Sequence, residues 1–347
     1  MSHADLVRRT FDAFSRRDLD QAESHMDPDV VIDWSNSMGP NAGVFRGIPE
    51  ARRWVESFLE VWEEFDWEID ELEHLGPDRL LMSTRVQGRG KGSGVQVTAR
   101  GAQLWTVRDG KVAEARMFQS RGDALSAFRR ESLEAARLYF VCEGLPAGGD
   151  AGPLLEAALR GGVDIVQLRE KSPRGAEELV PLAGPFRRAA TEHGGLFILN
   201  DRPDLVAACG ADGVHVGQDD MPVPEARELA GPTALVGLST HSPEQVEAAC
   251  AAQGDARPDQ LSVGPVWETP TKEGRPGTGL ELIEYAAREA AIPWFAIGGI
   301  DTGNVSSVVA AGARRIVVVR AIRDADDPEA AARSLRESLE ARVGAAS

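Results

Sequence analysis

The pattern of apolar and polar positions changes near residue 130. Before that point, Leu6, Val7, Phe11 and Phe14 form a helical apolar stripe, and near-helical spacing of aromatic residues predicts a second helix over 49–64. Short apolar or alternating runs at 30–34, 67–74, 79–86, 95–107 and 111–118 predict strands, with a tight hairpin turn at Asp109-Gly110. Helices followed by a meander of strands predict an α+β domain over residues 1–125.

After residue 130 one unit repeats: an apolar run, a polar loop and a helix-favouring stretch. The eight runs lie at 138–144, 164–170, 196–201, 213–217, 235–240, 260–265, 294–299 and 315–320. Continuous apolar strands that alternate with helices predict a parallel sheet buried on both faces. Eight such units favour an α/β TIM (β/α)₈ barrel over 138–347. An open doubly wound sheet is the alternative, but the first strand is not followed by GxGxxG.

The stretch 121–137 contains no proline and only one glycine, which predicts a helical connector over 126–137. The chain therefore divides into two domains and a connector.

Composition and charge exclude several classes of function. The net charge of −17 argues against nucleic acid and anionic membranes as partners. Three cysteines far apart in sequence argue against structural zinc. Without a signal peptide or a long apolar run, the expected compartment is the cytoplasm.

Polar residues gather where the predicted barrel strands end. Because the carboxyl ends of parallel barrel strands meet at one face, these side chains should converge on an active site. The carboxylates of Asp201 and Asp220 suit Mg²⁺, although both could instead cap helices. Residues 131–347 contain eighteen arginines and only two lysines, Lys171 and Lys272, and both follow strand ends. A compact ammonium that reaches a diphosphate is one physical reason, and chance placement is the alternative.

Residues 138–323 resemble the thiamine-phosphate synthase family. The resemblance is carried in order by QLREK (167–171), LNDRPDLV (199–206), GADGVHVGQDD (210–220), VGLSTH (236–241), VGPVWETPTKEG (263–274), AIGGI (296–300) and AGARRIVVVRAI (311–322). It implies a transferase of thiamine biosynthesis. That enzyme joins 4-amino-2-methyl-5-(diphosphooxymethyl)pyrimidine to 4-methyl-5-(2-phosphoethyl)thiazole, or its carboxylated form, and releases pyrophosphate.

The same resemblance assigns roles by position. The pyrimidine diphosphate would contact Gln167, Leu168, Arg169, Glu170, Lys171 and Asn200. Mg²⁺ would be bound by Asp201 and Asp220. The departing diphosphate would be stabilised by Arg169, Ser239 and Lys272 as the catalytic residues. The thiazole phosphate would contact Thr269, Pro270, Thr271, Gly299, Val319 and Arg320. The thiazole nitrogen carries no proton, so the reaction needs no catalytic base.

Two positions depart from the family pattern, because Arg320 stands where many relatives carry serine and Thr240 replaces a common alanine. Two alternatives to the synthase stay open. One is a catalytically silent regulatory module that binds phosphate or thiazole, and the other is a thiazole tautomerase-like barrel. Retention of Lys171, Asn200, Asp201, Asp220 and Lys272 favours the synthase.

Residues 1–125 resemble the SnoaL-like branch of the nuclear transport factor 2-like (NTF2-like) superfamily. The suggestive segments are DPDVVIDWS (27–35), FRGIPEARRWV (45–55) and RDGKVAEARMF (108–118). The resemblance implies a cone whose mouth can bind a small apolar ligand. Asp33 could act there as a base, whereas Trp34 is more simply a core residue. Ligand binding, dimerisation into a homo-oligomer and a separate reaction all stay open for this domain.

Overall fold

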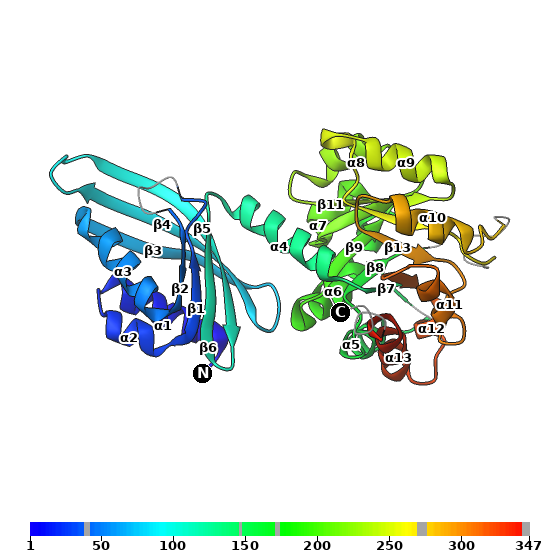
Figure 1. The fold of residues 1–347 in the computed structure, drawn as a ribbon, viewed down its shortest axis with the longest axis horizontal. Helices are drawn as coiled ribbons and strands as arrows, with labels where there is room; N and C mark the ends of the chain where they lie inside the picture. Colours follow the sequence, from blue (N-terminus) through cyan, green and yellow to red (C-terminus); the bar gives the residue numbers. More distant parts are fainter. Residues whose placement is uncertain (38–41, 146–147, 171–173, 269–275, 342–347) are drawn as a thin grey trace. The chain divides into compact units, whose positions relative to one another are not determined.

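The computed structural model describes residues 1–37, 42–145, 148–170, 174–268 and 276–341 (Figure 1). The chain forms two compact units, Met1–Phe128 and Arg129–Ser347. None of the described helices is long and apolar enough to cross a membrane.

The N-terminal unit is a curved sheet with helices on one face (Figure 1). The helices are α1 (His3–Ser15), α2 (Leu19–Ser24) and α3 (Gly47–Glu60). The strands, in spatial order, are β2 (Val44–Arg46), β1 (Met26–Asp33), β6 (Lys111–Phe118), β5 (Gln96–Arg108), β4 (Arg79–Gly90) and β3 (Trp62–His74). Neighbours are antiparallel except for the parallel pair of β1 and β6. Trp34, Trp54 and Trp67 pack between sheet and helices. The predicted α+β, NTF2-like domain is confirmed.

One boundary in this unit was predicted wrongly. The helix expected over 49–64 ends at Glu60, and Trp62 already begins β3. The spacing of the aromatic residues fits either one longer helix or a helix followed by a strand. In both cases the same side chains would pack against one core, namely Trp54, Phe58, Trp62 and Phe65. Pairing with β4, which starts at Trp62, decides for the strand. The Asp109-Gly110 hairpin is confirmed, because both residues have positive φ, 50° and 71°, as a type I′ turn requires.

Helix α4 (Arg121–Ala135) contains the point at which the two units divide. It begins earlier and ends earlier than the connector expected over 126–137. From Arg129 onward it belongs to the C-terminal unit, where the Arg129 guanidinium donates to Asp212 Oδ1 over 3.0 Å and to the Thr233 carbonyl over 3.0 Å.

The C-terminal unit is a closed barrel of eight parallel strands, surrounded by helices (Figure 1). The strands are β7 (Leu138–Cys142), β8 (Ile165–Leu168), β9 (Leu196–Asn200), β10 (Gly213–Val216), β11 (Leu235–Thr240), β12 (Gln260–Val263), β13 (Trp294–Ile297) and β14 (Ile316–Val318). The longer helices are α5 (Gly152–Arg160), α6 (Ala176–His193), α8 (Val223–Ala230), α9 (Pro243–Ala251), α10 (Glu281–Glu289) and α13 (Pro328–Glu340). The shorter helices are α7 (Val206–Cys209), α11 (Val305–Ala310) and α12 (Arg320–Arg323), with 3₁₀ turns at Pro203–Leu205 and Gly254–Ala256. The expected TIM barrel is confirmed.

The same hydrogen-bonded arrangement of an aspartate recurs at the amino ends of the strands. Asp164, Asp212 and Asp259 each stand directly before a strand, and each carboxylate accepts a backbone N–H from the start of the preceding strand. Each also forms a salt bridge with at least one arginine. Charged acceptors make strong hydrogen bonds to backbone N–H groups, so these three aspartates, here called the foot aspartates, hold alternate strand pairs together.

Candidate functional site

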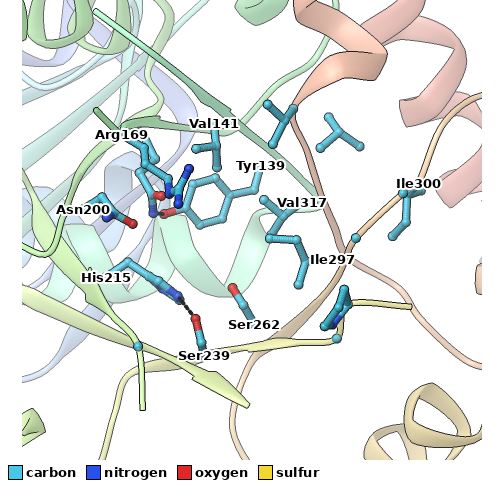
Figure 2. Close-up of a pocket in the computed structure, with 18 of the residues that line it drawn as sticks. Tyr139, Val141, Arg169, Asn200, His215, Ser239, Ser262, Ile297, Ile300 and Val317 are labelled. Atoms are coloured by element: carbon cyan, nitrogen blue, oxygen red, sulfur yellow. Dashed lines mark hydrogen bonds between the residues drawn. The ribbon is translucent and has the colours of Figure 1, made fainter. Parts of the chain in front are cut away.

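The carboxyl ends of the barrel strands surround a cavity of about 520 Å³. Its size is ordinary for a pocket that binds small molecules. One side is polar, with Arg169, Asn200, His215 and Ser239 close together (Figure 2). The other side is apolar and carries the side chains of Ile297, Ile300 and Val317 (Figure 2). The cavity can therefore hold a charged group at one side and a ring at the other.

Two carboxylates meet at the polar side. Asp201 follows β9 directly and has a φ of 57°, in a region where Asp and Asn are tolerated better than most residues. Its backbone N–H donates to the His215 carbonyl over 2.9 Å, and Asn200 Nδ2 donates to its Oδ2 over 2.5 Å. The Gly217 N–H donates a hydrogen bond to Asp220 Oδ2 over 2.8 Å. Burial, and after it the charge of Asp220, together raise the pKa of Asp201 to about 6. The Asp201 carboxyl group therefore ionises less readily unless a cation lies beside it.

This oxygen pair fits Mg²⁺ better than a metal that needs a closed protein cage. In the part of the chain that the structure describes, no third His, Cys, Asp or Glu completes a metal cluster with the pair. Mg²⁺ is usually bound by one or two carboxylates, water and substrate phosphate oxygens, so two carboxylates at the edge of an open cavity suffice.

The raised pKa of Asp201 predicts how Mg²⁺ acts on stability. Between an ordinary carboxyl pKa of 3.8 and about 6, the folded protein holds a proton that the unfolded chain has released. The contribution of Asp201 to stability therefore falls as pH rises through this range. Above it, Mg²⁺ can take the place of that proton, so it is expected to raise the Tm more at about pH 7.5 than at about pH 5.

Differential scanning fluorimetry at both pH values, with and without MgCl₂, measures this effect. The Asp201→Asn variant is the control, because it lacks the titrating group and should show a small Mg²⁺ shift at either pH. Equal Mg²⁺ shifts of the unaltered protein at the two pH values would contradict the prediction.

Tyr139 and Gln167 line the cavity together. Gln167 Nε2 donates to the Tyr139 hydroxyl oxygen over 2.7 Å, and both side chains are buried. Burial raises the pKa of Tyr139 well above its usual range, so the phenol stays neutral. Arg169 lies near Tyr139 and Asn200 (Figure 2), and its positive charge partly offsets the rise in the pKa of Asp201. A neutral amide and a cation thus line the same cavity, which suits a heterocycle that carries a diphosphate.

His215 and Ser239 extend the polar side across two strands. His215 Nε2 lies 3.0 Å from Ser239 Oγ, and both residues line the cavity (Figure 2). Sequence reasoning singled out Ser239 and missed His215 and Tyr139. Both missed residues stand inside apolar strands, where a lone His or Tyr is more often a core residue. The alternation of side chains along each strand was the available signal, since it points both residues into the barrel.

A glycine pair shapes the opposite wall. Gly298 and Gly299 have φ of 108° and 69°, and a Cβ on Gly298 would lie 2.5 Å from the Pro265 Cα. Only glycine fits, and its exposed backbone can approach a phosphate closely. Arg320 begins α12 at the end of the last strand and is exposed. Among the described residues, no hydrogen bond or ion pair engages its guanidinium, so its charge is available to an anion.

The structure brings most of the expected site residues together. Those that line the cavity are Gln167, Arg169, Asn200, Asp201, Asp220, Ser239, Gly299, Val319 and Arg320. Leu168 and Glu170 are not among the residues that line it, and their contact with the substrate stays a prediction. Leu168 is 1% exposed within the apolar core, and the Glu170 carboxylate accepts from the Gly144 N–H and from Arg174 Nε, over 2.7 Å each. The expected positions Lys171, Thr269, Pro270, Thr271 and Lys272 lie outside the described residues.

The N-terminal unit has a much smaller cavity, of about 40 Å³, between its helices and sheet. Aromatic side chains dominate its wall, among them Trp34, Trp54, Trp67 and Trp105. Asp33 does not line it. Its Oδ1 instead accepts from the N–H and the hydroxyl of Ser35. The observed position therefore does not support Asp33 as a base in this cavity.

Comparisons with known proteins divide the chain in the same two parts. The family model for thiamine monophosphate synthase matches residues 138–322, and that for the SnoaL-like domain matches 7–115. The thiamine-phosphate synthase of Arthrobacter sp. strain FB24 is 49% identical over 229 residues, which cover 60% of this chain and 96% of that protein. The Acidothermus cellulolyticus protein of the same name is 49% identical over 213 residues, which cover 61% and 99%.

A solved structure supports the same match. The thiamine phosphate pyrophosphorylase from Pyrococcus furiosus superposes with a TM-score of 0.53 at 30% identity, and the match covers 61% of this chain and 98% of that one. Because each of these relatives is covered almost completely, the N-terminal unit is an addition to what they share with this chain.

Proposed function

The chain belongs to the thiamine monophosphate synthase family, and from this premise we propose how the cavity of its barrel performs the coupling. The substrates would be the pyrimidine diphosphate and the thiazole phosphate named above. The supporting observation is the division of one cavity into a charged side and an apolar side. We place the diphosphate beside Arg169, Asp201 and Asp220, and the thiazole ring against Ile297 and Val317.

The coupling reaction does not require the protein to transfer a proton. The bond between the pyrimidine methylene carbon and the diphosphate oxygen breaks, and its electron pair leaves with pyrophosphate. A new bond forms between that carbon and the thiazole nitrogen, which has no proton to lose. The protein must therefore stabilise negative charge on the leaving group and hold the two rings in line.

Each side of the cavity has a part in this scheme. Mg²⁺, when bound by Asp201 and Asp220, would neutralise the diphosphate as a Lewis acid. The Arg169 guanidinium would add a charged donor, and Ser239 Oγ would add a neutral one. Gln167, held by Tyr139, would bind the aminopyrimidine through its amide. At the other side, the Gly298-Gly299 backbone and Arg320 would receive the thiazole phosphate. An arginine can grip phosphate with two parallel hydrogen bonds, which a serine cannot.

The test is an assay on the full chain. Both phosphorylated substrates are mixed with Mg²⁺, and thiamine phosphate is detected after oxidation to a fluorescent thiochrome. We expect product and pyrophosphate in equal amounts, and no product when a chelator is present or either substrate is omitted. A folded chain that binds both substrates without turnover would replace this proposal with the silent regulatory module. A thiazole isomer formed without the pyrimidine substrate would replace it with the tautomerase-like barrel.

The remaining expectations stay predictions. We place the reaction in the cytoplasm, where phosphorylated intermediates are retained, and leave assembly into a homo-oligomer to measurement. For the N-terminal unit, ligand binding and dimerisation are the predicted roles. The tryptophan-lined wall of its small cavity agrees with an apolar ligand.

A further inference from the structure

We propose that Gln260, which does not line the cavity, is a positioning residue for the departing diphosphate. Through His215 it would orient the Ser239 hydroxyl as a hydrogen-bond donor toward the cavity. The inference rests on the proposed function, because it deepens the role given there to Ser239. It is carried by three strands that place these side chains in one connected row.

The row depends on the absence of a side chain at Gly237 in the middle strand. His215 on β10, Gly237 on β11 and Gln260 on β12 are register partners, so they stand at one level of the barrel. A Cβ on Gly237 would lie 2.1 Å from Gln260 Nε2 and 2.5 Å from His215 Nδ1. Since Gly237 has no side chain, the two flanking side chains meet across it, with 3.1 Å between Gln260 Nε2 and His215 Nδ1.

These contacts indicate a direction for each hydrogen bond. Gln260 Nε2 faces His215 Nδ1, and Gln260 Oε1 is buried without a hydrogen-bond partner among the described residues. Because an amide N–H donates, we assign Nδ1 as the acceptor and place the ring proton on His215 Nε2. His215 Nε2 then donates to Ser239 Oγ, which lies 3.0 Å away. Ser239 Oγ is occupied as an acceptor on that side. Among the described residues, no acceptor engages its own proton, and the cavity is the direction into which it can point.

Burial makes this arrangement rigid. Gln260, His215 and Ser239 are 3%, 6% and 6% exposed, so water does not compete freely for their hydrogen bonds. A second contact holds the strand end, because Gln218 Nε2 donates to the Ser239 carbonyl over 2.6 Å. If the amide of Gln260 faced His215 with its oxygen, the opposite tautomer would form. Ser239 would then donate to His215 and present lone pairs to the diphosphate, which would repel it.

Gln260→Glu tests the proposal, because a carboxylate accepts where the amide donates. We expect the His215 ring proton to move to Nδ1 and kcat for thiamine phosphate formation to fall about tenfold to a hundredfold. The KM for the thiazole phosphate should change less than about twofold, because the far wall is untouched. In a Ser239→Ala background, Gln260→Glu should cause little further loss, since both act through one hydroxyl.

The matched control is Gln253→Glu, the same substitution at an exposed position, which should leave kcat unchanged. The second readout is nitrogen-15 NMR of histidine-labelled protein, with His215 assigned from the signal lost in His215→Asn. It needs no turnover and no folded Gln260 variant. A proton on Nδ1 in the unaltered protein would overturn the proposal, as would a full rate in Gln260→Glu. An inactive unaltered protein would instead refute the proposed function, while the NMR result would still show the state of the row.

Discussion

Asp201→Asn is expected to lower thiamine phosphate formation by about a hundredfold to a thousandfold, because it removes half of the carboxylate pair that would hold Mg²⁺ on the diphosphate. Asparagine is preferred to alanine for this test, since Asp201 has a φ of 57° and asparagine tolerates that backbone conformation. The rate is measured at several Mg²⁺ concentrations with the thiochrome assay.

The variant should remain folded, which separates loss of chemistry from loss of structure. Burial and the nearby charge of Asp220 raise the pKa of Asp201, so a neutral side chain there relieves a repulsion. Near pH 7.5 and without a divalent cation, Asp201→Asn should therefore melt no lower than the unaltered protein. Asp255→Ala, at an exposed position outside the cavity, serves as the activity control. A near-native rate of Asp201→Asn at ordinary Mg²⁺ concentrations would exclude Asp201 as a ligand.

Asp212→Ala should cost the barrel about 3–5 kcal/mol of its free energy of unfolding, the usual effect of breaking a buried ion pair. The Asp212 carboxylate is 5% exposed and accepts from Arg129 Nε over 3.0 Å, from Arg187 over 3.2 Å and from the Phe197 N–H over 2.9 Å. Its removal leaves a nearly buried arginine and a backbone N–H without their acceptor. Urea unfolding, followed by a signal from the barrel, measures the loss.

Asp326→Ala is the matched control, because Asp326 is exposed and its substitution should change stability by less than about 0.5 kcal/mol. Asp212→Asn should lie between the two, since an amide oxygen can still accept the Phe197 N–H without the charge. A loss below about 1 kcal/mol in Asp212→Ala would show that the foot aspartates are replaceable by solvent.

The sequence was most informative where one physical requirement dominates a whole segment. Each barrel strand is buried on both faces, so it must be a continuous apolar run, and all eight runs are strands. In the N-terminal unit the aromatic spacing after Trp54 suits both a helix and a strand. Only the pairing of β3 with β4, a contact between distant residues, settles where α3 ends.

The site shows the same distinction between local pattern and three-dimensional arrangement. Polar residues at strand ends identified Arg169, Asp201 and Asp220, because an apolar strand has no other need for them. Leu168 and Glu170 belong to a contiguous motif that the resemblance assigns as a whole. Neither lines the cavity, whereas the neighbouring Gln167 and Arg169 do. His215 and Gln260 were missed for the converse reason, since their meeting depends on the register of three strands and on Gly237.

The foot aspartates have a consequence for how this protein can evolve. They stand at the amino ends of the strands, whereas the residues that would contact substrate stand at the carboxyl ends. Folding and substrate choice therefore draw on different sets of positions. Substitutions at the carboxyl ends of the strands can change which ligand is bound while the foot aspartates keep the barrel stable. Selection for a new activity therefore need not compete with selection for a chain that folds.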